Sequence, residues 1–111
     1  MRAIKINSEA QTVEVIDFEG DFEAIQKEIG VDCFTCVNLD NDGNTLYVDD
    51  EGLFKDVPFF RLSLFGQPLA GNGLILGTGF EGESSHATCE VPKVEFFTRN
   101  EIALMSMMGA L

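Results

Sequence analysis

The chain opens with a pattern that predicts a β-hairpin. Lys5 stands between Ile4 and Ile6, which is the two-residue period of a strand with one buried face. Residues 12–18 are rich in the β-branched side chains that strands favour. The polar residues 8–11 between these runs have the composition of a turn. We therefore expect two antiparallel strands at the start of the chain.

The spacing of apolar residues then changes to that of a helix. Phe22, Ile25 and Ile29 recur every three or four residues, as on one face of an amphipathic helix. Asp21 stands where an N-cap is expected, and Gly30 stands where a helix exits through the left-handed conformation. The sequence therefore predicts one short helix between them.

A second hairpin follows this helix. Residues 32–39 and 44–49 have strand character, and the Asp-Gly pair at 42–43 suits the positive φ of a tight turn. Residues 50–58 are rich in turn-forming types, and Pro58 lacks the donor that a central strand needs. We expect a loop or a single helical turn there.

Strand signals continue in the second half of the chain. The compact apolar run at 74–76 is flanked by glycines and predicts the buried core strand. Residues 59–65 are apolar but interrupted by polar positions, so a strand and an extended segment both stay open. Residues 81–90 are small and polar and predict a surface loop, whereas 91–97 have β character.

The chain closes with the pattern of a capped helix. Thr98 and Glu101 match a capping box, which predicts a helix from Arg99 onward. Residues 102–111 are almost wholly apolar. This suits core packing or a self-contact, of which a homodimer through the C-terminal helix is one form, or a Met-rich binding face.

Together these elements predict a small α+β domain. We expect a mostly antiparallel sheet built from hairpins, with one central short helix and a C-terminal helix. A length of 111 residues suits one domain over 1–111.

The charge of the chain narrows the classes of partner. A net charge of -12 repels phosphate backbones, so direct nucleic-acid binding is disfavoured and a protein partner is expected. The same charge is compatible with mimicry of DNA towards a basic protein. No apolar run approaches the length that spans a bilayer. An odd count of three cysteines favours reduced thiols in a cytoplasmic setting.

Two sets of residues are candidates for binding. The first is acidic and would support contact with a basic partner if its side chains share one face; it consists of Asp40, Asp42, Asp49, Asp50, Glu51 and Asp56. The second is a glycine-rich turn that suits a small-molecule pocket between residues 71 and 79; it consists of Gly71, Asn72 and Gly73.

The cysteines and the single histidine suggest a metal alternative. Cys33, Cys36, His86 and Cys89 form two short-spaced pairs that could supply a four-coordinate zinc site. Against it, residues three apart on a strand point to opposite faces. We therefore favour no metal, and keep structural zinc as an alternative.

The chain offers no recognisable catalytic motif. Its glycines match neither a dinucleotide-binding nor a P-loop pattern, and no serine stands in a nucleophile elbow. The expectation is a protein that is not an enzyme and needs no cofactor.

Three stretches carry a resemblance to a known family. They are residues 22–30 with their exit glycine, residues 47–52 followed by Pro58, and residues 69–77. In these stretches the chain resembles the domain-of-unknown-function family numbered 3846, and residues 98–102 look like the capped final helix of that family. The resemblance implies phage or prophage origin and a location in the host cytoplasm, and it implies no known activity.

Three hypotheses about function remain at this point. The first is a non-enzymatic acidic module that binds and inhibits a host or phage protein, with DNA mimicry as its sharpest form. The second is a small-molecule-binding or sequestering protein, and the third is a structural zinc-binding domain.

Overall fold

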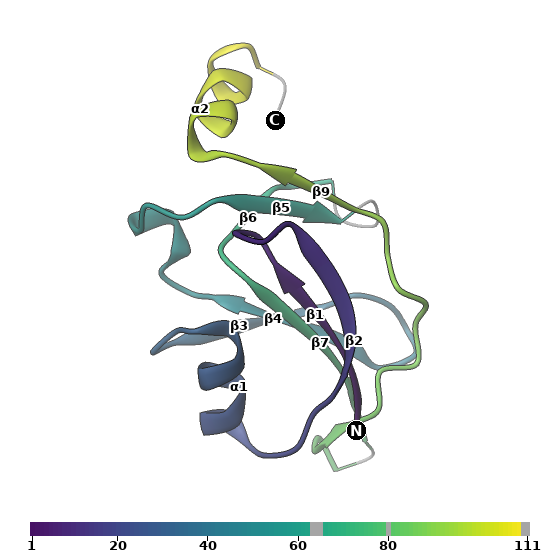
Figure 1. The fold of residues 1–111 in the computed structure, drawn as a ribbon. Helices are drawn as coiled ribbons and strands as arrows, with labels where there is room; N and C mark the ends of the chain where they lie inside the picture. Colours follow the sequence, from purple (N-terminus) through teal and green to yellow (C-terminus); the bar gives the residue numbers. More distant parts are fainter. Residues whose placement is uncertain (63–65, 80, 110–111) are drawn as a thin grey trace.

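The computed structural model describes residues 1–62, 66–79 and 81–109, and it has an α+β fold dominated by strands (Figure 1). The elements along the chain are β1 (Arg2–Asn7), β2 (Thr12–Asp17), α1 (Phe22–Ile29), β3 (Phe34–Asn38), β4 (Asn44–Asp49), the 3₁₀ turn η1 (Gly52–Phe54), β5 (Phe59–Leu62), β6 (Leu69–Ala70), β7 (Gly73–Thr78), β8 (Ser84–Ser85), β9 (Val94–Phe97) and α2 (Arg99–Met107). This confirms the predicted fold class, with its central and C-terminal helices.

The strands form two antiparallel sheets. The larger sheet has the order β2-β1-β7-β4-β3, and β8 pairs with the end of β7. The smaller sheet has the order β6-β5-β9. The prediction that residues 74–76 form the core strand is confirmed, because β7 lies at the centre of the larger sheet and residues 73–77 are buried.

The larger sheet is covered on both faces, since alternate residues of its central strands enter two apolar clusters. Ile75 points into the first cluster, to which the smaller sheet contributes Phe60. Leu74 and Leu76 point into the second cluster, which α1 covers with Ile25. Fully burying a side chain of this size stabilises a fold by about 1.5–3 kcal/mol. The continuous apolar run in β7 thus reflects a strand buried on both sides.

Helix α1 has the boundaries that the sequence predicts. The Asp21 carboxylate accepts a 3.1 Å hydrogen bond from the Glu23 N–H, and Gly30 ends the helix at a φ of 74°. Lys5 of β1 forms a 2.9 Å ion pair with Glu28. The two caps therefore fix the length of this helix, and the ion pair with β1 helps to fix its position on the sheet.

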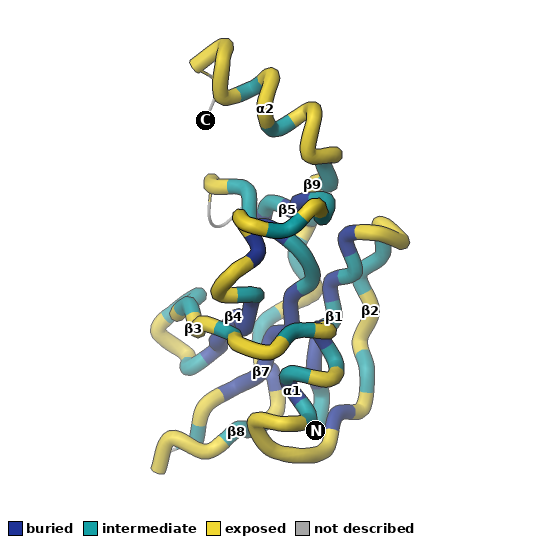
Figure 2. The backbone as a smooth tube through the Cα atoms, turned by 90° about the vertical axis from the view of Figure 1, so that its left-hand side faces the viewer, coloured by how far each residue is buried: buried dark blue, intermediate teal, exposed yellow. Residues whose placement is uncertain are grey.

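Helix α2 is capped as predicted but is not part of the core. The Glu101 N–H donates to Thr98 Oγ1 over 3.1 Å, and the Thr98 N–H donates to Glu101 Oε1 over 3.0 Å. No described residue of α2 is buried, and Leu104 and Met107 are exposed. Figure 2 shows the helix standing away from the sheets. The expectation that this helix packs into the core is wrong, whereas contact between two copies stays a prediction.

Other differences from the sequence pattern come from long-range pairing. The predicted loop at 81–90 contains the short strand β8 and the buried Ala87. The ambiguous segment at 59–65 forms β5 over its first four residues, because Phe59 pairs with Phe97 of β9; residues 63–65 lie outside the described residues. Strand β6 was not predicted, and no local pattern marks it.

The close approach of the chain at Gly77 generates a stability prediction. A Cβ on Gly77 would overlap the His86 carbonyl oxygen and lie 2.8 Å from Ser85 Oγ. We expect Gly77→Ala to lower the free energy of unfolding by about 2–3 kcal/mol. The comparison is Gly30→Ala, which meets no atom within 4 Å and should lose about 1 kcal/mol through its positive φ alone. Urea unfolding of both variants checks this, and equal losses would contradict it.

Candidate functional site: a cleft at the ends of the central strands

A cleft forms at one end of the central strands of the larger sheet, where β1 and β4 end and β7 begins. Ile6 of β1 and Val48 of β4 both pair with Gly73, the first residue of β7. This register places the end of β1, the end of β4 and the turn before β7 side by side. Residues 29–31 at the exit of α1, together with Lys55, Val57 and Pro58, complete the walls, which enclose about 290 Å³.

A shielded ion pair forms one wall of this cleft. Asp49 Oδ2 lies 2.8 Å from Lys55 Nζ, and the Asp49 side chain is only 4 % exposed. Its other oxygen accepts a 2.9 Å hydrogen bond from the Glu51 N–H. The hydrogen bond to Asp49 raises the pKa of Lys55, so this lysine stays protonated. Asp49 therefore holds the segment after β4 in place.

The glycine-rich turn forms the opposite wall, and two of its three predicted residues line the cleft. The Ser8 N–H donates a 2.9 Å hydrogen bond to Asn72 Oδ1, and the Gly71 N–H donates over 2.9 Å to the Pro58 carbonyl. Gly71 has a φ of 84°. Gly73 does not line the cleft: it is buried, and a Cβ there would lie 2.9 Å from Phe60 Cζ. Its absent side chain serves core packing.

The six candidate acidic residues do not share one face. Asp40 and Asp42 lie at the turn before β4, whereas Asp49 to Glu51 lie at its far end. A six-residue strand separates the two groups by about 17 Å. Asp56 is exposed and lines a separate hollow beside the start of α2. The six residues therefore form no single compact patch, and the shielded side chain of Asp49 is not part of an acidic surface.

Asp40 has a structural explanation instead. Its Oδ1 accepts from the Asp42 and Asn44 N–H groups, and its Oδ2 accepts a 2.8 Å hydrogen bond from Asn44 Nδ2. The buried Asn44 in turn accepts a 2.8 Å hydrogen bond from the Thr88 N–H. Asp40 thus stabilises the β3–β4 turn and orients the side-chain amide of Asn44, which accepts hydrogen bonds from the N–H groups of residues 88 and 89.

The four candidate zinc ligands are not brought together. Cys36 lies on the edge strand β3, with Cys33 just before it, and both are exposed. His86 Nδ1 accepts a 2.8 Å hydrogen bond from the Arg2 N–H, and Cys89 packs beside the first apolar cluster. Among the residues that the structure describes, no three His, Cys, Asp or Glu side chains are grouped to hold a metal ion.

The cysteines also lack the environment of reactive thiols. Burial raises the pKa of Cys36 and Cys89, and burial together with the nearby carboxylate of Glu51 raises the pKa of Cys33. Metal ligation and nucleophilic attack both need the thiolate. The raised pKa values therefore disfavour a redox role, whereas the positions of the four residues are what disfavours the zinc alternative.

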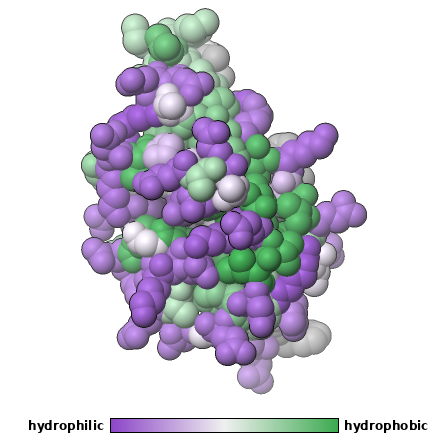
Figure 3. Space-filling model, viewed as in Figure 1, coloured by the Kyte–Doolittle hydropathy of each residue, from purple (hydrophilic) through white to green (hydrophobic). Residues whose placement is uncertain are grey.

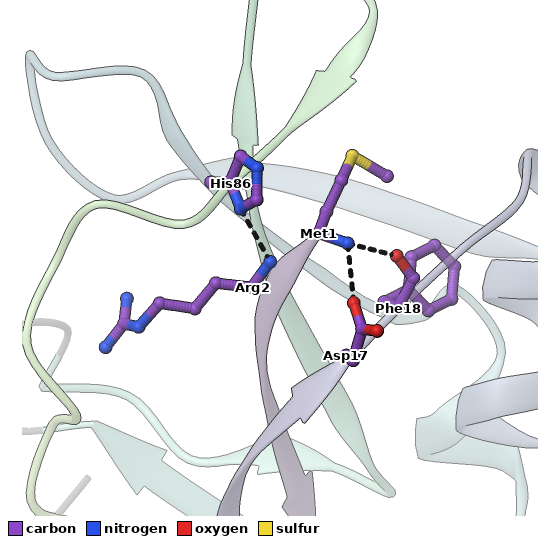
Figure 4. A network of polar contacts seen from close by, with 5 residues as sticks. All are labelled: Met1, Arg2, Asp17, Phe18 and His86. Atoms are coloured by element: carbon purple, nitrogen blue, oxygen red, sulfur yellow. Dashed lines mark hydrogen bonds and ion pairs between the residues drawn. The ribbon is translucent and has the colours of Figure 1, made fainter.

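The described N-terminal residue joins a polar network of its own (Figure 4). The Met1 ammonium donates to Asp17 Oδ1 over 2.9 Å and to the Phe18 carbonyl over 2.8 Å. One residue later, the Arg2 N–H donates to His86. These bonds hold together the open end of the first hairpin and link it to His86, which has a structural role as acceptor.

With the site described, the comparisons with known proteins can be set beside it. The sequence pattern of the family described as domain of unknown function, DUF3846, matches residues 1–99. The chain belongs to the DUF3846 family. No curated protein and no solved structure gives a significant match. Because the match ends at Arg99, the resemblance of residues 98–102 to a final family helix is not supported beyond that point.

The stretches that carry the likeness to DUF3846 meet at the cleft. The exit of α1 contributes Gly30, the end of β4 contributes Asp49, and the turn before β7 contributes Asn72. Sequence reasoning missed three further polar lining residues, Asn7, Glu9 and Lys55. The only local signal for them was their place at a strand end or in a predicted turn, since strand register brings them together.

The hydrogen bonds on Asp40 generate a prediction about acid stability. Bonds from Asn44, and the bond from the N-terminal ammonium in the case of Asp17, lower the pKa of these carboxyls. A lowered folded-state pKa gives stability that is present above the unfolded value of about 4 and is lost as pH falls through the folded value. The melting temperature should therefore decrease as the pH is lowered below about 4.

Asp40→Asn separates this effect from the relief of charge repulsion that acid also brings. We expect the variant to melt lower than the parent near neutral pH, and the gap to narrow as pH falls. Melting curves of both proteins over that range measure the gap, and a gap independent of pH would count against the assignment.

Proposed function

We propose that this DUF3846 protein is a non-enzymatic binding module that engages, and thereby inhibits, a basic region of a host or phage protein. The observation that carries the proposal is the unequal placement of charge. Five of the seven positive side chains make ion pairs or hydrogen bonds within the described part of the molecule, whereas most negative side chains face solvent. Such a surface attracts and orients a basic partner before contact.

Five of the seven positive charges are engaged as follows, while Lys27 and Lys93 are exposed. Lys5, Lys55 and Arg61 pair with carboxylates, the last in a two-pronged contact with Glu95. Arg2 donates to the carbonyls of Ala87 and Cys89, and Arg99 donates to those of Leu53 and Lys55. These cations offer little attraction to an outside anion.

The acidic residues have the opposite distribution. All of them except Glu28, Asp40 and Asp49 are exposed, and hydrophilic residues cover most of the face in Figure 3. Negative charge is dense near the cleft, where Asp32, Asp50 and Glu51 all act on Cys33. We place the partner at this end of the molecule.

DNA mimicry is the sharpest form of this proposal, and we assign the action to the host cytoplasm. Its support is the net charge of -12 spread over a molecule 43 Å long, which is comparable with one turn of duplex DNA. Among the described residues, no helix has the length and apolar character to cross a membrane.

A second candidate function is favoured by the cleft itself. Its volume of about 290 Å³ lies at the lower limit of pockets that hold small molecules, roughly 300 Å³. A metabolite bound there would raise the melting temperature. A panel of amino acids, amines and nucleotides tests this by thermal shift: a saturable increase of several degrees supports it, and no increase with any compound rejects it.

The main proposal predicts a strongly salt-dependent complex. Immobilised protein should retain basic nucleic-acid-binding proteins from a heparin-selected bacterial fraction, and duplex DNA should compete for them. The affinity for a retained protein, measured by calorimetry, should fall at least tenfold between about 50 and 200 mM salt. A complex that is insensitive to salt would contradict the proposal.

Matched charge variants locate the contact. Asp50→Asn with Glu51→Gln and Asp56→Asn removes three charges at the proposed end, and Glu14→Gln with Glu19→Gln and Glu23→Gln removes three elsewhere. The first variant should lose more affinity than the second, while both should keep the parent's fold by circular dichroism. Equal losses would show that only the total charge matters.

A further inference from the structure

We propose that the cleft at the ends of β1, β4 and β7 is a receptor for one arginine side chain of the basic partner, together with the main-chain carbonyl next to it. This rests on the proposed function and deepens it, because it names the group that is recognised. Five properties of the cleft support it: its field, its hydrogen-bonding groups, its apolar walls, its size and its place in the acidic surface.

The field in the cleft favours a cation. Helix α1 ends there with residues 29–31, and the C-terminal end of a helix carries partial negative charge. The exposed carboxylate of Glu9 lies on the rim. Asp49 neutralises Lys55 over 2.8 Å, so the one ammonium in the wall does not offset Glu9.

Two asparagines provide hydrogen-bond donors of fixed orientation. Asn7 Oδ1 accepts from the Ala10 N–H over 3.0 Å, and Asn72 Oδ1 accepts from the Ser8 N–H over 2.9 Å. Each amide oxygen is thereby occupied, and the NH₂ group is left to face a ligand. Among the described residues, none accepts a hydrogen bond from either NH₂ group. A carbonyl oxygen is the ligand atom that such donors fit.

The apolar part of the wall suits the stem of a long side chain. Ile29, Val31, Val57 and Pro58 line the cleft between the polar groups. Arginine buries its methylene groups against surfaces of this kind while its charged head stays near polar partners. Its planar head can also donate to a carboxylate and to a carbonyl at once, which an ammonium does with less directional control.

The size of the cleft suits one long side chain. A volume of about 290 Å³ falls just below the range of roughly 300–1,000 Å³ that holds drug-sized ligands. The cleft therefore holds one side chain and its flanking peptide group, and a longer basic segment must lie along the acidic surface outside it.

The test is a titration of isotope-labelled protein with the neutral-ended tripeptide acetyl-Gly-Arg-Gly-amide, followed by amide chemical shifts. We expect saturable shifts confined to the amides of Gly30, Val31, Gly71 and Asn72. The same tripeptide with citrulline keeps the shape of arginine but replaces one NH₂ donor by a carbonyl oxygen and lacks the charge, and it should leave these amides nearly unshifted.

Two single variants of equal charge change complete the test. Glu9→Gln at the rim should weaken the tripeptide roughly fivefold, as expected for loss of one charged hydrogen bond. Glu14→Gln on β2, which is also exposed, should leave the affinity unchanged. Equal effects of the two variants, shifts spread over the whole surface, or equal binding of the citrulline peptide would each overturn the inference.

The outcomes also separate this inference from the function on which it rests. If a basic protein binds in a salt-dependent manner while the cleft amides do not respond to the arginine peptide, the cleft assignment fails and the acidic binding module stands. If the cleft takes the peptide but basic proteins are not retained, the receptor stands and the proposed function fails.

Discussion

The pairing of β7 with β1 on one side and β4 on the other is the constraint on which the rest of the structure depends. The residues of β7 contribute to both apolar clusters, Ile75 to the cluster on one face of the sheet and Leu74 and Leu76 to the cluster on the other. A slip of one residue would exchange the two faces. Gly73 and Gly77 add to this constraint, since Phe60 and His86 occupy the space of their side chains. The register of the sheet is therefore closely fixed.

This register also builds the cleft. Because Ile6 and Val48 both lie opposite Gly73, the residues that follow β1 and β4 emerge beside the turn that precedes β7. None of the polar groups of the cleft lies in the middle of a strand, yet several are held by a neighbour: Asn7 by Ala10, Asn72 by Ser8, and Lys55 by Asp49. A site built mainly from turn residues is well defined because the rigid sheet fixes where each turn begins.

Local signals predicted much of the fold. Asp21 and Gly30 set the ends of α1, Thr98 and Glu101 set the start of α2, and residues 74–76 marked the core strand. The pairing of β5 with β9 could not be predicted, because it joins Phe59 to Phe97 and no local pattern encodes a partner so distant. Asp40 and Asp49, by contrast, are separated by a strand that the local pattern does predict, and they lie at opposite ends of β4.

The candidate site was predicted only in part. Gly71, Asn72 and Asp49 were identified from their types, whereas Asn7 at the end of β1 and the turn residues Glu9 and Lys55 carry no distinguishing signal until the register brings them together. The zinc alternative illustrates the opposite error, since Cys33, Cys36, His86 and Cys89 have suggestive spacing but lie in different places. The spacing of two residues in the sequence predicts their distance in space when both belong to one helix, strand or turn. It does not do so when they belong to different strands.

The central claim is that the turns beside Gly73, at the ends of the central strands, form a receptor for a positively charged side chain within an acidic surface. A crystal structure of the protein grown with the acetyl-Gly-Arg-Gly-amide peptide tests it most directly. The account predicts the guanidinium within hydrogen-bonding distance of the Glu9 carboxylate, with a peptide carbonyl facing the amide of Asn72. A peptide bound elsewhere on the acidic surface, with the cleft filled by water alone, would contradict it.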